Sequence, residues 1–176
     1  MLASGKTRGI MNNKKIKSPR RVATGKMGHT FSNLLNHIVF STKGRKNLLY
    51  KDIRDLLYSY ICGIAKTEGC LIIKIGGIED HIHILTKLKP SLAPSEFARK
   101  IKANSSKWMH EKYPNLKDFS WQSGFSCFSV SESGKTGVIQ YIDRQETHHR
   151  RIPFRDELKM FLQKHRIDYD PEHFLD

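Results

Sequence analysis

The sequence predicts an α+β fold in which four antiparallel strands form one sheet and two helices pack on one face of it. Short apolar runs with strand character alternate along the chain with longer segments whose apolar residues recur at helical spacing. Their order is β-α-β-β-α-β, that of a split βαβ, ferredoxin-like sheet. This order narrows the fold class but leaves the function open, because one fold serves many activities.

The first strand and the first helix follow from two clear patterns. Residues 34–42 are rich in large apolar and β-branched side chains and stop at a Lys-Gly-Arg turn, which indicates a buried strand. From residue 52 to residue 66 the apolar side chains recur at helical spacing, and Gly69 follows. These residues are therefore predicted to form a helix that ends before Gly69.

The second half of the sheet begins with a predicted hairpin. Two short apolar runs, 71–75 and 81–85, are joined by a segment that starts with two glycines. Pro94 suits the first turn of a second helix, which is expected to end before Pro114. Alternating residues at 125–130, bounded by glycine on either side, predict the fourth strand.

Beyond the sheet, the sequence predicts a C-terminal helix that bears a tyrosine. This helix is expected over residues 136–149, and a further helical pattern follows Pro153. No internal repeat is found, so the sheet and its helices are expected to form one domain.

Charge indicates a polyanionic partner. The 176 residues are enough for one domain with a core, and they carry a formal charge of +14. Much of the excess lies in residues 1–27, which contain no Asp or Glu and few large apolar residues. We predict a flexible basic N-terminal arm at residues 1–27 and a single domain at residues 28–176. An inert solvated tail is the alternative to a DNA-contacting arm.

Cysteine usage and hydropathy predict a cytoplasmic protein. Cys62, Cys70 and Cys127 are widely spaced and form no Cys-x-x-Cys pair, so they are expected to be small core residues in a reducing compartment. No apolar stretch approaches the length of a membrane span, and no signal-peptide pattern follows the basic start.

The first candidate functional element is the His81-Ile-His83 segment of the third strand. Residues two apart in a strand project from the same face, about 7 Å apart, so the two imidazoles could share one metal ion while Ile82 points into the core. The alternative is a pair of histidines that are merely packed or partly exposed on the sheet.

The second candidate element is the predicted tyrosine helix. Tyr141 and Gln145 are four residues apart, which places phenol and amide on one face of a helix. A half-buried tyrosine with its hydroxyl at the surface is the alternative. Together, two imidazoles, an amide and a phenol would suit phosphodiester transfer, because an ion draws charge off a phosphate and nearby positive charge favours phenolate.

These residues lie in an ordered set of motifs that resembles the single-tyrosine HUH transposases of small bacterial insertion sequences, the IS200 type. The resemblance covers about residues 29–172. The matching motifs are His37-Ile-Val-Phe-Ser-Thr-Lys43, Ile75-Gly-Gly, Asp80-His-Ile-His-Ile-Leu85, Lys102-Ala-Asn-Ser-Ser106, Trp121-Gln122, Phe128-Ser-Val-Ser131 and Tyr141-Ile-x-x-Gln145 with His148-His149.

The resemblance implies a role for each site residue. His81 and His83 look like the metal-binding pair, Tyr141 like the nucleophile and Gln145 like the third ligand, which His148 could replace or assist. The implied ion is Mg²⁺ or Mn²⁺, with no nucleotide cofactor, and imidazole donors make Mn²⁺ plausible. The implied substrate is single-stranded DNA that folds into a hairpin at the ends of a mobile element. Cleavage would leave a 5′-phosphate on Tyr141, and the family implies a homodimer.

Basic residues on two segments are predicted to contact DNA. They are Lys43, Arg45 and Lys46 after the first strand, and Lys100, Lys102, Asn104 and Lys107 on the second helix. Their phosphate contacts would be salt-dependent and blind to sequence, and a merely solvated face is the alternative for each of them.

Two other functions stay open at this point. A non-catalytic, RRM-like nucleic-acid-binding module would need exposed aromatic residues on the central strands, where this chain has His-Ile-His instead. A host-domesticated relative that acts on repeated hairpin elements would share the residues above and differ in genomic context.

Overall fold

The computed structural model describes residues 31–172, 174 and 175 of the chain. The predicted basic arm at residues 1–27 lies outside the described residues, and its boundary stays a prediction. Among the described residues, no helix is both long and apolar enough to cross a membrane.

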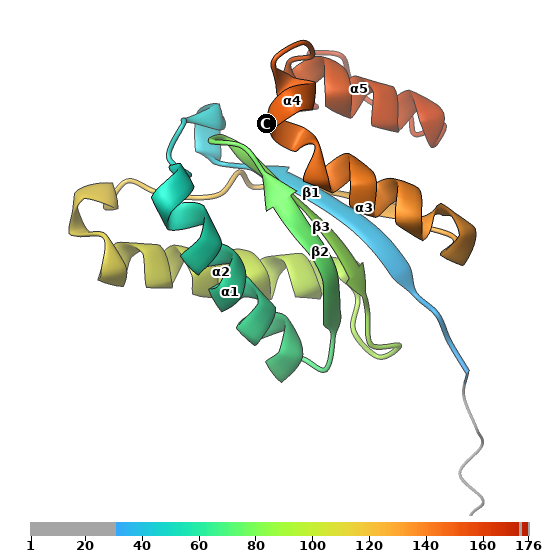
Figure 1. Ribbon diagram of the computed structural model, residues 1–176, viewed down its shortest axis with the longest axis horizontal. Helices are drawn as coiled ribbons and strands as arrows, with labels where there is room; N and C mark the ends of the chain where they lie inside the picture. The colour runs from blue at the N-terminus through green and yellow to red at the C-terminus, as the bar shows by residue number, and fades with distance from the viewer. Residues whose placement is uncertain (1–30, 173, 176) are drawn as a thin grey trace, which may run out of the picture. The chain divides into compact units, whose positions relative to one another are not determined.

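Four antiparallel strands form the predicted sheet (Figure 1). They are β1 (Leu35–Ser41), β2 (Leu71–Gly77), β3 (His81–Lys87) and β4 (Ser126–Ser129). Their order in the sheet is β2-β3-β1-β4, so the strands that are adjacent in sequence, β2 and β3, form a hairpin at one edge. This is the order of a split βαβ sheet, and it confirms the predicted ferredoxin-like α+β fold.

Two long helices cover one face of the sheet, as predicted: α1 (Lys51–Thr67) and α2 (Pro94–Lys112) (Figure 1). Pro94 begins α2, and the helix ends before Pro114. Alternate residues of β1 and β3, among them Ile38, Phe40 and Ile82, point into this layer and are completely or almost completely buried. The main core therefore lies between the sheet and α1 and α2.

Three further helices lie on the opposite face: α3 (Lys135–Asp143), α4 (Gln145–His149) and α5 (Phe154–Lys164) (Figure 1). A smaller apolar cluster joins this layer to the sheet. It consists of Val39 and Phe128 from the strands and Phe154, Leu158 and Leu162 from α5. Short 3-10 turns at Lys43–Arg45, Pro114–Leu116 and Glu132–Gly134 complete the described elements.

The prediction of one continuous helix over residues 136–149 is wrong. The chain leaves helical geometry at Arg144 (φ −97°, ψ 12°), which separates α3 from α4. The Arg144 N–H donates to the carbonyl of Tyr141, three residues back, so the last turn of α3 tightens and the chain changes direction. Tyr141 and Gln145 therefore belong to two separate helices, and the helical spacing used in the prediction does not apply between them.

Candidate active site

The two predicted metal-binding histidines lie side by side on β3, on the face that carries α3, α4 and α5. His81 and His83 are both 0% exposed, whereas Ile82 between them points into the main core. The Nδ1 atom of His81 is 2.7 Å from a carboxylate oxygen of Asp80, and Nδ1 of His83 is 3.0 Å from Nε2 of His37. Because each Nδ1 has a partner, each ring is fixed in orientation and its Nε2 is left to face the site.

A carboxylate from α5 lies opposite these two Nε2 atoms. Oε2 of Glu157 is 3.7 Å from Nε2 of His81, 3.5 Å from Nε2 of His83 and 3.3 Å from Nε2 of His149. One donor atom from each of these four residues lies within 4.8 Å of every other. Four buried or half-buried donors from β3, α4 and α5 thus converge on one point.

This cluster fits a divalent ion. Nε2 of His83 and Oε2 of Glu157 are buried without a hydrogen-bond partner, and unsatisfied buried polar atoms are costly. Bonds of about 2.1 Å to one ion place neighbouring donors roughly 3.0–3.4 Å apart. The distances of 3.3–3.7 Å from Oε2 of Glu157 to the three imidazoles come near this range. Three imidazoles and one carboxylate are a donor set that suits Mn²⁺ or Zn²⁺ better than Mg²⁺.

Gln145 completes the cluster on its α4 side and is buried. Its Oε1 is 3.3 Å from Nε2 of His81 and 3.0 Å from Nε2 of His149, and its Nε2 donates to Oε1 of Glu157 over 3.2 Å. Although the helix breaks at Arg144, the amide still reaches His81 of the predicted pair. Its role as an ion ligand stays a prediction.

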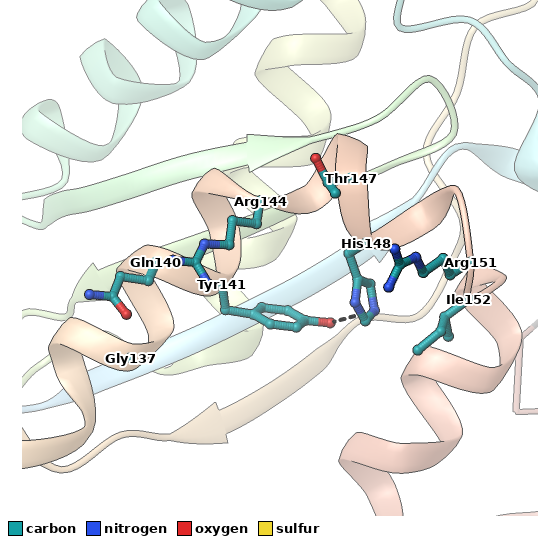
Figure 2. Close-up of a pocket in the computed structure, with 8 residues that line it drawn as sticks. All are labelled: Gly137, Gln140, Tyr141, Arg144, Thr147, His148, Arg151 and Ile152. Atoms are coloured by element: carbon teal, nitrogen blue, oxygen red, sulfur yellow. Dashed lines mark hydrogen bonds between the residues drawn. The ribbon is translucent and has the colours of Figure 1, made fainter.

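The half-buried Tyr141 places its hydroxyl at the same cluster. The hydroxyl donates to Oε1 of Glu157 and lies 3.3 Å from Nε2 of His148. Figure 2 shows Tyr141 and His148 pointing toward each other from α3 and α4. The ring centroids of Tyr141 and His83 are 5.8 Å apart. The structure thus brings together all four predicted site residues, Tyr141, His81, His83 and Gln145.

The sequence of the chain matches one family model, described as "Transposase IS200 like", over residues 30–145, which is more than half of the chain. The chain belongs to the IS200-like transposase family. This match confirms the family resemblance that the sequence motifs indicated. As a member of a transposase family, the chain is a DNA-processing enzyme.

Curated relatives and solved structures agree with this assignment. The transposase for insertion sequence element IS200 of Salmonella typhimurium is 31% identical over 123 residues, which cover 68% of this chain and 81% of the relative. ISDra2 transposase TnpA of Deinococcus radiodurans is 27% identical over 114 residues, or 62% of this chain and 81% of the relative.

Two solved structures share the fold. A crystal structure of a putative transposase from Deinococcus radiodurans superposes with a TM-score of 0.56 at 25% identity and covers 68% of this chain and 97% of that one. The structure of a REP-associated tyrosine transposase bound to a REP hairpin superposes with a TM-score of 0.54 at 16% identity, and covers 84% and 92% of the two chains.

Glu157 and His149 are absent from the residues that sequence reasoning selected as ligands. Both lie beyond the stretch that matches the IS200-like family model. For Glu157 one signal exists: it stands on the apolar stripe of α5 with Phe154, Leu158 and Phe161, where a carboxylate is out of place unless it has buried partners. His149 belongs to a matching motif but had no assigned role.

Proton affinities within the cluster follow from burial and from the Glu157 charge. Burial raises the pKa of the Tyr141 phenol, and the neighbouring Glu157 carboxylate raises it further, so the metal-free transposase holds a neutral phenol. Burial also favours a neutral Glu157, but the nearby imidazoles of His149 and His83 outweigh it and lower the pKa of that carboxyl. Glu157 is therefore ionised at neutral pH.

The residues predicted to contact DNA do not gather at this site. Lys100, Lys102, Asn104 and Lys107 belong to α2, on the opposite face of the sheet (Figure 1). Lys102 donates to the carbonyls of Gln122, Ser123 and Gly124, and burial lowers its pKa to about 8. Lys43, Arg45 and Lys46 are exposed after β1. DNA contact by these seven residues stays a prediction, and Lys102 has a structural role besides.

The metal-free transposase is expected to lose stability as the pH falls from 7 to 5. Burial lowers the pKa of His37 from 6.5 to about 3 and that of His83 from 6.5 to about 4. Between pH 6.5 and 4 the unfolded chain therefore binds protons that the folded chain does not, and the free energy of unfolding decreases with falling pH. At pH 5 this amounts to about 2 kcal/mol for each histidine.

Urea unfolding in EDTA at pH 7 and pH 5 measures this effect. His149 offsets part of the loss: burial lowers its pKa, but the neighbouring Glu157 carboxylate outweighs burial and raises it, so the stability that His149 contributes declines as the pH rises. The stability that Glu157 contributes is fully present above about pH 4.3 and is lost only at lower pH. It therefore does not change between pH 7 and pH 5. Equal unfolding free energies at the two pH values would contradict the neutral, buried state of His37 and His83.

Proposed function

We propose that this transposase cleaves and rejoins single-stranded DNA through a covalent 5′-phosphotyrosine on Tyr141, with a divalent ion held by His81 and His83. One observation carries the proposal: a single carboxylate, Glu157, accepts a hydrogen bond from the Tyr141 hydroxyl with one oxygen and faces three imidazoles with the other. Nucleophile and metal donors therefore form one site within one chain.

The proposed reaction is a transesterification that Tyr141 begins. Its phenolic oxygen attacks the scissile phosphorus, the P–O3′ bond breaks, and the DNA leaves with a free 3′-hydroxyl while the 5′-phosphate stays on the tyrosine. His148, whose Nε2 is 3.3 Å from the phenol, and the Glu157 carboxylate are the groups placed to take the phenol proton, and the departing 3′ oxygen gains a proton in exchange. Attack by a 3′-hydroxyl on the phosphotyrosine reverses these steps and reseals the strand without a nucleotide cofactor.

In this proposal His81 and His83 hold the ion, joined by Glu157, His149 and the Gln145 amide oxygen. When bound, a divalent ion would draw charge off the scissile phosphate and offset the Glu157 charge that disfavours phenolate. The imidazole-rich donor set favours Mn²⁺ over Mg²⁺. Asp80 and His37 support the two β3 imidazoles from behind through their Nδ1 atoms.

A hairpin-forming single strand is the substrate that we propose, because one solved neighbour of the same fold is bound to a REP hairpin. An RRM-like binding module is disfavoured, since α1 and α2 cover one face of the sheet and α3, α4 and α5 cover the other (Figure 1). The homodimer implied by the family resemblance stays a prediction. A domesticated relative would use the same chemistry on repeated hairpins.

The test is the formation of a covalent protein–DNA adduct. End-labelled single strands from both flanks of the gene are incubated with the full chain and Mn²⁺, Mg²⁺ or EDTA and resolved on a denaturing gel. We expect an adduct with a divalent ion, none in EDTA, and Tyr141 as the modified residue by mass spectrometry. An equal adduct in EDTA, or an adduct on another residue, contradicts the proposal.

A further inference from the structure

Two clefts meet at the proposed nucleophile. The first, of about 530 Å³, is lined by Tyr141, Arg144, His148, Arg151 and their neighbours on α3 and α4, and we name it the basic cleft (Figure 2). The second, of about 470 Å³, lies between β1, β4, α3 and α5. We name it the aromatic cleft, because its lining includes His37, Phe128, Tyr141, Phe161 and His165. Gly137 and Tyr141 line both clefts.

The basic cleft carries two guanidinium groups without partners. Within residues 31–172, 174 and 175, neither Arg144 nor Arg151 forms an ion pair or a side-chain hydrogen bond, and both are exposed. Arg54, by contrast, is buried and bonded to Glu146, and Arg99 pairs with Glu96. Unpaired guanidinium groups beside a phosphate-attacking phenol are suited to bind the DNA backbone.

The aromatic cleft offers partly exposed rings instead. Phe161 and His165 are half-buried and pack on the buried Phe128, with their ring centroids 5.2 Å and 4.6 Å from its centroid, so these two rings are the ones that a base could reach. Its volume falls in the usual range for ligand sites, about 300–1,000 Å³. Unpaired bases stack on aromatic side chains whatever their sequence, so this cleft is suited to a base rather than to a phosphate.

A glycine of α3, Gly137, contributes to the lining of both clefts. Inside a helix, glycine lowers helix stability by about 1 kcal/mol relative to alanine. No atom lies within 4 Å of where its Cβ would be, so packing does not require a glycine here. A side chain at this position would instead project from the part of α3 that, with Tyr141, lines both clefts.

We propose that a single DNA strand crosses α3 at Gly137, with backbone phosphates bound by Arg144 and by Arg151 and an adjoining base in the aromatic cleft. The phosphodiester between the arginine contacts and the base then lies at the Tyr141 hydroxyl. The base in the aromatic cleft has to be unpaired, so the arrangement selects single strands over duplexes. This inference rests on the proposed function for its substrate, and it adds the strand's path and a base site.

The first test blocks the proposed path. Binding of a fluorescent oligothymidylate of roughly ten nucleotides is measured by anisotropy on the full chain carrying Tyr141→Phe, which cannot cleave. Adding Gly137→Leu is expected to weaken binding by about tenfold, the effect of losing one stacked base. Gly63→Leu is the matched control, because Gly63 is also helical with no atom within 4 Å of its Cβ, and it lies in α1. Equal affinities of the Gly137 and Gly63 variants would overturn the proposed path.

The second test separates phosphate binding from base binding. Arg144→Gln with Arg151→Gln is expected to reduce the salt slope of binding by about 0.7 for each phosphate that is no longer neutralised, whereas Arg99→Gln leaves it unchanged. An abasic strand of equal length is expected to bind the parent protein about tenfold more weakly and to be insensitive to Gly137→Leu. An unchanged salt slope, or equal binding of abasic and normal strands, refutes the assignment.

The binding tests and the test of the proposed function are independent, because binding is measured on the Tyr141→Phe protein, which cannot form the adduct. If wild-type protein forms the Tyr141 adduct but Gly137→Leu binds normally, the strand path is wrong and the proposed function stands. If the strand binds as expected but no adduct forms, the clefts are confirmed as a binding site and the transesterification is wrong.

Discussion

Replacing Tyr141 with Phe is expected to reduce covalent adduct formation to below detection, a loss of at least about 1,000-fold. The variant keeps the ring, whose centroid lies 5.5 Å from that of Phe161, and removes only the oxygen that would attack phosphorus. Oε1 of Glu157 retains the hydrogen bond from Gln145, so the free energy of unfolding should change by only about 1 kcal/mol. A folded protein with no adduct is therefore the expected result.

Tyr60→Phe is the matched control for this experiment. Tyr60 lies on α1, on the other side of the sheet, where its ring stacks on Trp108 at 5.0 Å. Adducts are quantified on denaturing gels, and the melting temperature of each variant verifies folding. If the Tyr141→Phe protein still forms an adduct at a rate near that of the Tyr60→Phe protein, Tyr141 is not the nucleophile.

His83→Ala is expected to abolish the stabilisation of the protein by Mn²⁺. An ion at 100 times its dissociation constant stabilises the folded state by about 2.7 kcal/mol, which raises the melting temperature. In the variant the ion loses an imidazole whose Nε2 has no hydrogen-bond partner in the described part of the protein, so the affinity for Mn²⁺ should fall by at least about 100-fold. The melting temperature should then no longer respond to the same Mn²⁺ concentration.

The control for that variant is His110→Ala. His110 lies near the end of α2, and its Nε2 is 2.7 Å from the carbonyl of Phe119, on the face of the sheet away from the cluster. Melting curves with Mn²⁺ and with EDTA are compared for both variants and the parent. A Mn²⁺-induced rise in the His83→Ala protein equal to that of the parent would refute the metal site.

The strand and helix order was predictable because local patterns determine it. The alternation of the third strand alone placed His81 and His83 on one face and Ile82 on the other, as the structure has them. The break at Arg144 gave no such signal, since no proline or glycine marks it. Beyond the break, the Gln145 amide is buried among His81, His149 and Glu157, an arrangement that spacing along one helix cannot reveal.

Glu157 was missed for a related reason. The apolar residues Phe154, Leu158 and Phe161 are sufficient to predict an amphipathic helix at this position. Nothing in the pattern therefore indicated that the segment carries a functional residue. Only the three-dimensional arrangement shows this carboxylate beside imidazoles from β3 and α4. The lysines of α2 were predicted to contact DNA from their charge, which the sequence shows, whereas the sequence does not show that α2 lies on the opposite face of the sheet from the His81–His83 cluster.

Helix α3 packs so closely on the sheet that Gly76 of β2, which has no side chain, determines how near Tyr141 lies to the imidazoles. A methyl group on Gly76 of β2 would lie 2.8 Å from Cγ2 and 3.0 Å from the carbonyl oxygen of Ile142, the residue next to Tyr141. Any larger side chain there would lift the helix and carry the phenol away from the imidazoles. The position of the Tyr141 hydroxyl at the imidazoles therefore depends on the missing side chain of Gly76 in β2.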